Sequence, residues 1–294
     1  MAKWNVVVNP VAGRVPVPIT RVRAALDAAG VDAEIEVPGS PEESKAVVRA
    51  AVMSGATHIA MAGGDGSVNL AANALLEVED IELPVIGVLP IGTGCDLLRT
   101  FGMPQDLEGA ARHLATEDVY PIDVATLEGS WGTRYFVNVA QAGVGAAAAQ
   151  TAARLSRRLG ASRYPIAFAA RLPRFPAARV VVETERRTYE SRALAVIMAN
   201  AQFFAGGWNV APKATLVDGV LDIQIIDCAK PRAPALVPKV IRGTHLTDRA
   251  VRRLSAATFA ISTDVPWPVE ADGDLVGNTP VTGRVIPAAL RLKI

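Results

Sequence analysis

Short apolar segments alternate with helix-like segments through the first 122 residues. The apolar segments are WNVVVNP, AEIEV, HIAMA and PVIGVLP, and each runs into turn residues or glycine. Between them, apolar residues recur at helical spacing, as in residues 19–29 and 41–54. Strands that alternate with helices predict a parallel sheet with right-handed crossovers. We therefore expect an α/β N-terminal lobe at residues 1–122.

After residue 122 the pattern changes to short segments that are alternating or β-branched. Examples are RYFVNVA, ARVVVETE, RRTYESRALAVIMA, GVLDIQIID and AATFAIST, separated by Gly, Pro, Asn or Asp. Such segments are typical of antiparallel strands. We expect a mainly antiparallel β-sandwich C-terminal lobe at residues 123–284, interrupted by an Ala-rich and a basic helical segment. Residues 285–294 are a candidate to return to the first lobe.

Composition narrows the functional classes. The 294 residues include 30 Lys and Arg against 29 Asp and Glu, and a net charge of +1 does not support nucleic-acid binding. Two cysteines, Cys95 and Cys228, cannot form a disulfide framework and lack metal-ligand spacing, which favours a reducing compartment. The N-terminal apolar run is too short for a secretory signal. We expect a cytoplasmic protein, with peripheral contact at the inner membrane face left open.

Three glycine-bearing loops follow strands of the expected parallel sheet. They are Asn9–Arg14, the GGDG loop after HIAMA, and Pro90–Asp96. Glycines at a strand-to-helix junction let backbone N–H groups approach an anion, and ligands bind at this edge of open α/β sheets. A carboxylate there, Asp65, suits phosphates when Mg²⁺ lies between them. The alternative for an isolated GGDG is a tight turn with a helix-capping aspartate.

The motifs NPVAG, GGDGSVN and PIGTGCDLLRTFGMP, in this order and at these separations, resemble the diacylglycerol kinase catalytic domain family. That family includes bacterial lipid kinases, sphingosine kinases and ceramide kinases. GGDG alone would also admit the NAD kinases, which share the fold of the first lobe. YFVNVAQAGVGAAA, GGWNVAPKATLVDGVLDIQII and VEADGDLVGNTPVTGRVIPAALRL resemble later segments of the lipid kinases. The likeness therefore covers essentially the whole chain.

The resemblance implies an ATP- and Mg²⁺-dependent kinase that transfers the γ-phosphoryl group of ATP to a lipid hydroxyl, on diacylglycerol or a related lipid. By position, the implied nucleotide-side residues are Asn9, Ser40, Gly63, Gly64, Asp65, Gly66, Ser67, Val68, Asn69 and Thr93. Ser40 has an equally good explanation as an ordinary helix N-cap.

Acidic residues of a turn near the C-terminus complete the implied catalytic set. The family has an Asp-Gly-Glu turn whose glutamate is usually given the proton-acceptor role, and this chain has Asp272 and Asp274 at the matching positions. Asp274, helped by Asp272, would deprotonate the acceptor hydroxyl, and Asp65 with Mg²⁺ would offset phosphate charge. Asp-Gly is also the commonest hairpin turn, which is the alternative explanation. Cys95 is a second departure, because the family generally has asparagine there.

A second Mg²⁺ site is implied by the resemblance to bacterial members, in which one side chain joins backbone carbonyls. By position it involves Asp218 with Thr215 and Val220. Oxygen ligands from a loop suit a hard cation. A further hairpin turn is the alternative for this segment.

The implied acceptor is a lipid with a free hydroxyl, which requires an apolar cleft in the second lobe. The segment Ala146–Leu172, including Tyr164, Pro165 and Phe168, is our candidate lining, although core packing would explain the same residues. Arginines near this segment make it a candidate for membrane contact. A homodimer is left open. The rival functions are a kinase for a soluble small-molecule hydroxyl, an NAD kinase, and a non-catalytic nucleotide- or lipid-binding regulator.

Overall fold

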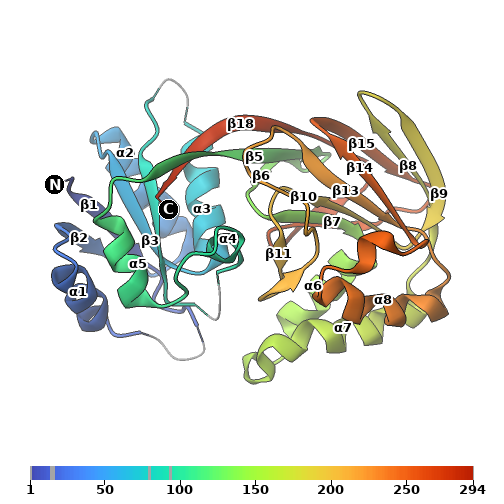
Figure 1. Cartoon of the computed structure of the whole chain (residues 1–294), viewed down its shortest axis with the longest axis horizontal. Helices are drawn as coiled ribbons and strands as arrows, with labels where there is room; N and C mark the ends of the chain where they lie inside the picture. The colour runs from blue at the N-terminus through green and yellow to red at the C-terminus, as the bar shows by residue number, and fades with distance from the viewer. Residues whose placement is uncertain (1, 14–16, 79–80, 93–94, 294) are drawn as a thin grey trace. The chain divides into compact units, whose positions relative to one another are not determined.

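The computed structural model describes residues 2–13, 17–78, 81–92 and 95–293 (Figure 1). The chain divides into two compact units, and each is described by itself. Unit 1 comprises Met1–Ile122 with Ala288–Ile294, and unit 2 comprises Asp123–Pro287. The chain passes from one unit to the other within two strands, β5 (Val119–Gly129) and β18 (Val281–Lys293).

Unit 1 is built on a parallel sheet. Its strands are β1 (Trp4–Val8), β2 (Ala33–Glu36), β3 (His58–Gly63) and β4 (Val85–Pro90), and its helices are α1 (Ile19–Ala28), α2 (Pro41–Met53), α3 (Asp65–Leu76), α4 (Asp96–Thr100) and α5 (Leu107–Leu114). The strand order is β2-β1-β3-β4, all parallel, and the end of β18 joins β4 in parallel. The predicted α/β lobe is confirmed.

Helices cover both faces of this sheet. On one face α1 and α5 pack on alternate residues of β1, including Val6 and Val8. On the other face lie α2 and α3, which contact each other and the sheet. Because both faces are covered, the strands are buried along nearly their whole length, as expected for parallel sheets. The carboxyl ends of β1, β3 and β4 are left as adjacent loops.

Helix α3 begins at Asp65, inside the glycine-rich loop itself. Gly64 takes the N-cap position with an extended backbone, which lets the helix start at once. Asp65 then occupies the first turn, where a negative charge is favoured by the helix dipole.

Unit 2 is mainly antiparallel. After β5 its strands are β6 (Gly132–Phe136), β7 (Val139–Gly143), β8 (Ala178–Thr184), β9 (Thr188–Ala193), β10 (Ala195–Ala199), β11 (Phe203–Phe204), β12 (Trp208–Asn209), β13 (Leu221–Ile226), β14 (Val251–Ala256), β15 (Thr258–Thr263), β16 (Pro268–Ala271) and β17 (Asp274–Asn278). Its α-helices are α6 (Val144–Arg154), α7 (Arg163–Arg171) and α8 (Ala233–Ile241), and its 3₁₀ helices are η1 (Arg157–Ser162), η2 (Leu172–Arg174), η3 (Lys230–Arg232) and η4 (His245–Thr247).

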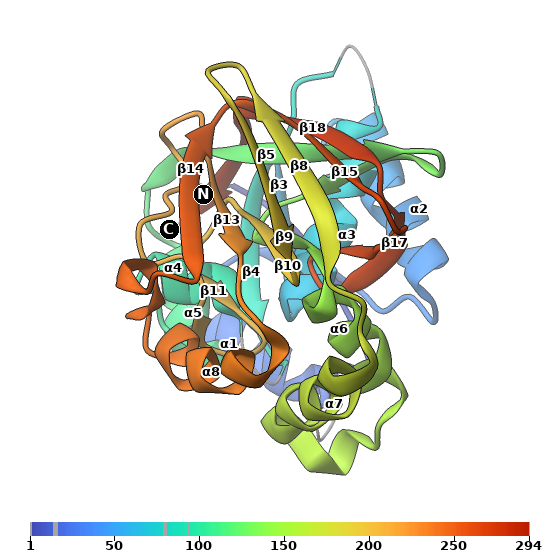
Figure 2. The same ribbon diagram turned by 90° about the vertical axis from the view of Figure 1, so that its right-hand side faces the viewer.

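Two sheets form the predicted sandwich. One has the order β14-β13-β10-β7-β16-β17, and the other runs β18-β15-β8-β9 with β5 beside β18 and β6 beside β5. Apolar residues from both sheets, such as Met198 and Ile261, share one core with Trp267. Helices α6, α7 and α8 lie together at one side of the unit (Figure 2). The β-sandwich prediction is confirmed.

Two segments that we expected to be single strands are each divided. RYFVNVA breaks between β6 and β7, because the N–H groups of Val137 and Asn138 donate to the Asp272 carboxylate instead of a neighbouring strand. The segment with β9 and β10 is divided at Leu194 because the two strands belong to different sheets. Neither break has a Gly or Pro signal, so the sequence pattern alone could not locate them.

Strand β14 was also missed. Its exposed residues Arg252 and Arg253 lie on the edge strand of the six-stranded sheet. Charged side chains are common on edge strands, where they discourage pairing with another chain.

Candidate active site

The glycine loop between β3 and α3 is shaped by close packing. A Cβ atom at Gly63 would lie 2.1 Å from the Ser67 Oγ, so only glycine fits at this position. Asn9, at the end of β1, donates from Nδ2 to the same Ser67 Oγ at 3.2 Å. Gly64 offers no side chain to cap the helix. The first loop and the first turn of α3 are thereby held together at the carboxyl edge of the sheet.

Gly66 differs from its neighbours because the fold does not require a glycine there. Its backbone is not in the left-handed region, and a Cβ atom built at Gly66 would meet nothing within 4 Å. Alanine in the first turn of α3 would also be better for the helix. A glycine that neither conformation nor packing explains is consistent with close approach of a ligand to the backbone.

The loop after β4 lies directly against the glycine loop. The N–H groups of Ile91 and Gly92 donate to the Gly63 carbonyl at 3.2 and 3.3 Å. A Cβ atom at Gly92 would lie 3.1 Å from the Gly64 Cα, which requires a small residue. Thr93, the remaining predicted nucleotide-side residue of this loop, lies outside the described residues.

Asp65 joins the glycine loop to α4. Its carboxylate accepts hydrogen bonds from the N–H groups of Asp96 at 2.9 Å and Leu97 at 3.1 Å, and the Cys95 thiol donates to it over 3.6 Å. Burial, and then the Asp65 charge, raise the pKa of Cys95, so the thiol remains protonated. Cys95 therefore supplies a weak donor where the family generally has an asparagine amide.

Three predicted residues do not present side chains at the surface of the loop. Val68 and Asn69 are both 2% exposed, and the Asn69 side chain accepts from Asn73 Nδ2 at 3.2 Å. Ser40 caps its own helix α2, because its Oγ accepts from the Glu43 N–H at 3.1 Å. The hydrogen bond from the Glu43 N–H to Ser40 is the one that an ordinary helix N-cap makes, as in the alternative explanation of Ser40.

In unit 2, Asp272 and Gly273 form the tight turn of the β16–β17 hairpin. Both have positive φ, 47° and 92°, as a two-residue type I′ turn requires. The Asp272 carboxylate accepts from the N–H groups of Val137, Asn138 and Val139 at 2.7 to 2.9 Å. Asp272 thus fixes the turn against the start of β7.

Asp274, at the start of β17, is the accessible acid of this turn. Its side chain is 68% exposed, and one oxygen lies 2.8 Å from Nη2 of Arg134 on β6. The Arg134 side chain is only 23% exposed, so Asp274 is the member of this ion pair that faces solvent. Of the two predicted acids, Asp274 is therefore the one whose carboxylate is open to solvent.

Glu270 is an acid that our reading of the sequence missed. It is fully buried two residues before Asp272, and its Oε2 accepts from the Gly273 N–H at 2.7 Å. Burial raises the pKa of Glu270 to about 8. The available signal was a glutamate between Val269 and Ala271 in an otherwise apolar strand.

The predicted second metal site lies at a turn with two nearby acids. The Asp218 Oδ1 accepts from the Val220 N–H at 3.2 Å, and the Asp123 Oδ2 accepts from the Gly219 N–H at 2.7 Å. Burial and the Asp123 charge raise the pKa of Asp218. The negative charges of the two carboxylates repel each other, and a hard cation bound between them would relieve this repulsion. Asp123 was not among the predicted ligands, and no cluster of three acidic, His or Cys side chains occurs in the described ranges.

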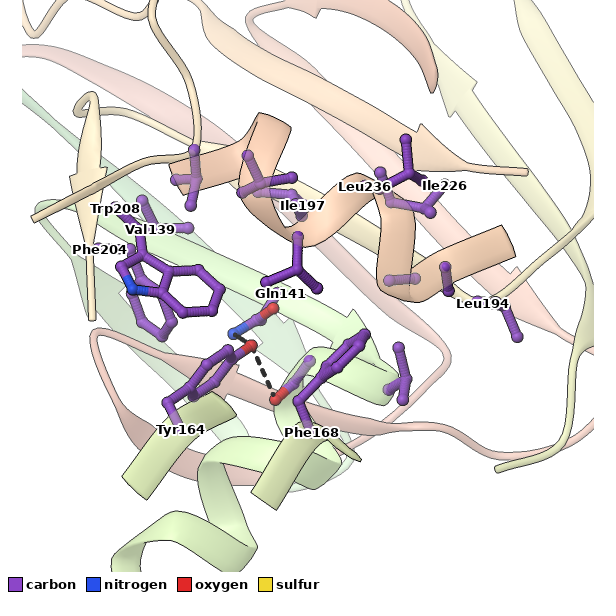
Figure 3. A pocket seen from close by; sticks show the side chains of 17 residues that line it. Val139, Gln141, Tyr164, Phe168, Leu194, Ile197, Phe204, Trp208, Ile226 and Leu236 are labelled. Atoms are coloured by element: carbon purple, nitrogen blue, oxygen red, sulfur yellow. Dashed lines mark hydrogen bonds between the residues drawn. The ribbon is translucent and has the colours of Figure 1, made fainter. Parts of the chain in front are cut away.

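An apolar pocket of about 700 Å³, part of it open to solvent, lies in unit 2 between β7, β10 and the helices α7 and α8 (Figure 3). Tyr164 and Phe168 of the predicted segment line it, whereas Leu172 packs in the sandwich core. Val139 connects the pocket to the β16–β17 turn at Asp272, Gly273 and Asp274, which we call the acidic turn. Its side chain lines the pocket, and its N–H donates to Asp272.

Comparisons with known proteins identify the family. Residues 3–127 match the diacylglycerol kinase catalytic domain, and residues 138–294 match the YegS C-terminal NAD kinase beta sandwich-like domain. The chain therefore belongs to the diacylglycerol kinase-like family of lipid kinases, which are phosphotransferases acting on an alcohol group. The predicted recognition is confirmed.

Particular relatives span most of the chain. The diacylglycerol kinase of Mycobacterium tuberculosis (strain H37Rv) is 30% identical over 275 residues, 92% of this chain and 87% of the relative. The lipid kinase YegS of Escherichia coli (strain K12) is 25% identical, over 90% and 87% of the two chains. A crystal structure of a diacylglycerol kinase from Bacillus anthracis superposes with a TM-score of 0.76 over 99% of this chain and 96% of that chain. At 22% identity, it bears on the fold alone. Within the described chain, no helix has the length and apolarity needed to cross a bilayer.

Proposed function

We propose that this protein transfers the γ-phosphoryl group of ATP to the free hydroxyl of a neutral acyl lipid such as diacylglycerol. The observation that carries the proposal is the connection in unit 2 between an apolar pocket and an exposed acid. Val139 lies on the pocket and beside Asp272, and Asp274 follows in the same turn. Unit 1 supports it with a glycine loop at the carboxyl edge of a parallel sheet, the usual place for a ligand.

On the nucleotide side, the backbone of Gly64, Asp65 and Gly66 would bind the phosphates at the N-terminus of α3. Asn9 holds Ser67 and so fixes this turn. Asp65 positions α4 through its two hydrogen bonds from the backbone N–H groups of Asp96 and Leu97, and its charge lies at the turn where a metal would bind. Mg²⁺, when bound, would neutralise part of the phosphate charge.

On the acceptor side, Asp274 would accept the proton of the lipid hydroxyl as the γ-phosphorus is attacked. A base must approach its hydroxyl to within about 3 Å, and an exposed side chain at the start of a strand can do so after leaving Arg134. Asp272 holds the turn through three backbone hydrogen bonds. The second metal would bind Asp218 with Asp123 and with carbonyl oxygens of Thr215 and Val220.

Peripheral membrane contact would give the pocket access to its lipid. Exposed apolar side chains, Ile166 on α7 and Ile241 on α8, accompany the exposed cations Arg171 and Arg174 near the pocket helices. Basic residues near an anionic surface contribute about 1 kcal/mol each. We propose that this side of unit 2 contacts the cytoplasmic leaflet.

The vesicle test compares wild type with the double variant Arg171→Glu, Arg174→Glu. Wild type should sediment with phosphatidylglycerol vesicles at low salt, and the double charge reversal should weaken binding by about 10-fold or more. Binding should fall for both proteins as salt rises. Equal sedimentation of the two proteins would exclude this surface, and the exposed pair Arg186→Glu, Arg187→Glu serves as the matched control.

The acceptor is tested with labelled ATP and a panel of diacylglycerol, a sphingoid base, phosphatidylglycerol and soluble alcohols. We expect phosphorylated diacylglycerol as the main product. A labelled soluble alcohol would support the rival small-molecule kinase, NAD as an acceptor would indicate an NAD kinase, and ATP binding with no product would indicate a regulator. A homodimer remains a separate prediction, to be tested by the mass of the protein in solution.

A further inference from the structure

Polar groups are rare on the wall of the pocket. Among the described residues that line it, only Gln141, Tyr164 and Trp208 have polar side-chain atoms. Figure 3 shows the Gln141 amide and the Tyr164 hydroxyl pointing toward one another, with the aromatic rings of Phe168 and Trp208 on either side. Burying an amide in an apolar wall costs free energy unless its hydrogen bonds are made.

The Gln141 amide and the Tyr164 hydroxyl have room in the pocket wall, and the hydrogen bonds between them and to Gly145 are long. A Cβ atom at Gly145 would lie 1.8 Å from the Gln141 Oε1, so the amide occupies room that only glycine leaves. Gln141 Nε2 donates to the Tyr164 hydroxyl at 3.4 Å, and that hydroxyl donates to the Gly145 carbonyl at 3.4 Å. Both are longer than a good hydrogen bond of about 2.9 Å. A ligand oxygen can therefore compete for these donors.

A buried acid lies beside Gln141. Glu270 is the partner of Gln141 in the β16–β7 register, so the two side chains lie on the same face of the sheet. The Glu270 carboxyl is fully buried, its Oε2 accepts from the Gly273 N–H at 2.7 Å, and its interaction with the Gln141 side chain opposes the rise of its pKa. Burial raises the pKa of Glu270 to about 8, so near neutral pH the group is uncharged. The surroundings of Gln141 therefore favour a neutral ligand group over a phosphate or an ammonium.

Gln141 lies on the same strand, β7, as the residue that contacts the acidic turn. Val139, which donates its N–H to Asp272, precedes Gln141 by two residues, a rise of about 7 Å along a strand. Apolar lining continues past Gln141, with Leu194, Ile226 and Leu236 (Figure 3). A lipid whose free hydroxyl lies at the turn would place its ester next to Gln141 and its acyl chain against these residues.

We propose that Gln141 and Tyr164 form a specificity-determining subsite that binds the ester carbonyl of a neutral glycerolipid. The inference rests on the proposed function, because it requires the lipid to occupy this pocket. Gln141 and Tyr164 donate to the carbonyl, and the uncharged Glu270 supports Gln141 from the neighbouring strand. An acceptor with chains of equal length but no carbonyl should therefore bind less tightly.

The experiment compares 1,2-dioctanoylglycerol with its ether analogue, 1,2-di-O-octylglycerol, which lacks both carbonyls. Binding is followed by the fluorescence of Trp208 on the pocket wall, and the variant Trp208→Phe identifies that signal. We expect wild type to bind the ester about 10-fold more tightly than the ether, as one good hydrogen bond allows. In Gln141→Leu the ratio should fall close to one. Ile197→Ala, the control on the same wall, should weaken both ligands and keep the ratio.

Tyr164→Phe is the second variant and keeps the aromatic ring. It should lower the preference in affinity for the ester over the ether by about 3-fold. If Gln141→Leu does not fold, this variant alone tests the subsite. A wild-type ratio of one, or an unchanged ratio in both variants, would overturn the subsite. Ester preference without phosphorylated product would reject the proposed kinase function and leave the subsite standing. Phosphorylated product together with an ester-to-ether ratio of one would support the kinase function and reject the subsite.

Discussion

Asp274→Asn is expected to lower the rate of phosphoryl transfer to diacylglycerol by at least about 100-fold, the usual contribution of a general base. Asparagine keeps the size and the turn position of aspartate but cannot take the hydroxyl proton. Because the side chain is 68% exposed, the free energy of unfolding should change by less than about 1 kcal/mol. The rate is measured with labelled ATP, and binding of ATP and lipid should be nearly unchanged.

The matched control for Asp274 is Arg134→Gln, which removes the ion pair and leaves the carboxylate. Its effect on the rate should be small, because the Asp274 carboxylate, which would take the proton, stays in place and 68% exposed. If Asp274→Asn turned over at the wild-type rate, another group would have to accept the proton. An equal loss in Arg134→Gln and Asp274→Asn would assign the effect to the ion pair and not to a base.

Glu270→Gln is expected to stabilise the protein at alkaline pH by several kcal/mol. The pKa of Glu270 is about 8 in the folded protein, against an ordinary value of 4.5. Between these values the folded state keeps a proton that the unfolded state has released, so the stability of wild type falls as pH rises from about 4.5 to about 8. The full difference corresponds to roughly 5 kcal/mol, and the variant lacks it.

Urea unfolding of wild type and Glu270→Gln from pH 5 to pH 9 provides the measurement. The difference between their free energies of unfolding should grow by about 1.4 kcal/mol per pH unit up to about pH 8, and then level off. Parallel curves for Glu270→Gln and wild type would show that Glu270 titrates normally.

The architecture of both units could be predicted because hydrophobic periodicity is local. Strand–helix alternation identifies the parallel sheet, and short alternating strands identify the sandwich. The break between β6 and β7 could not be predicted, because it depends on Asp272, more than 130 residues away in the sequence. Likewise, β14 was hidden by arginines whose exposure depends on its edge position.

The arrangement of the candidate site could be predicted only where motif and local geometry coincide. Gly63 and Ser67 lie in one turn, and adjacent parallel strands bring Asn9 to them. Roles that depend on distant partners could not be predicted. The carboxylate of Asp65 caps α4, a contact 31 residues along the chain, and Glu270 has its perturbed pKa because of burial by the whole sandwich.

Binding of MgATP to wild type and to Gly66→Ala tests the central claim most directly, namely that the first turn of α3 binds the phosphates of ATP. The added methyl group meets no protein atom within 4 Å, and alanine should stabilise the helix by up to about 1 kcal/mol. Calorimetry should show one site in wild type, and at least about 10-fold weaker binding in a variant that melts no lower than wild type. Equal affinity in the two proteins, or no heat of binding to wild type, would contradict the account.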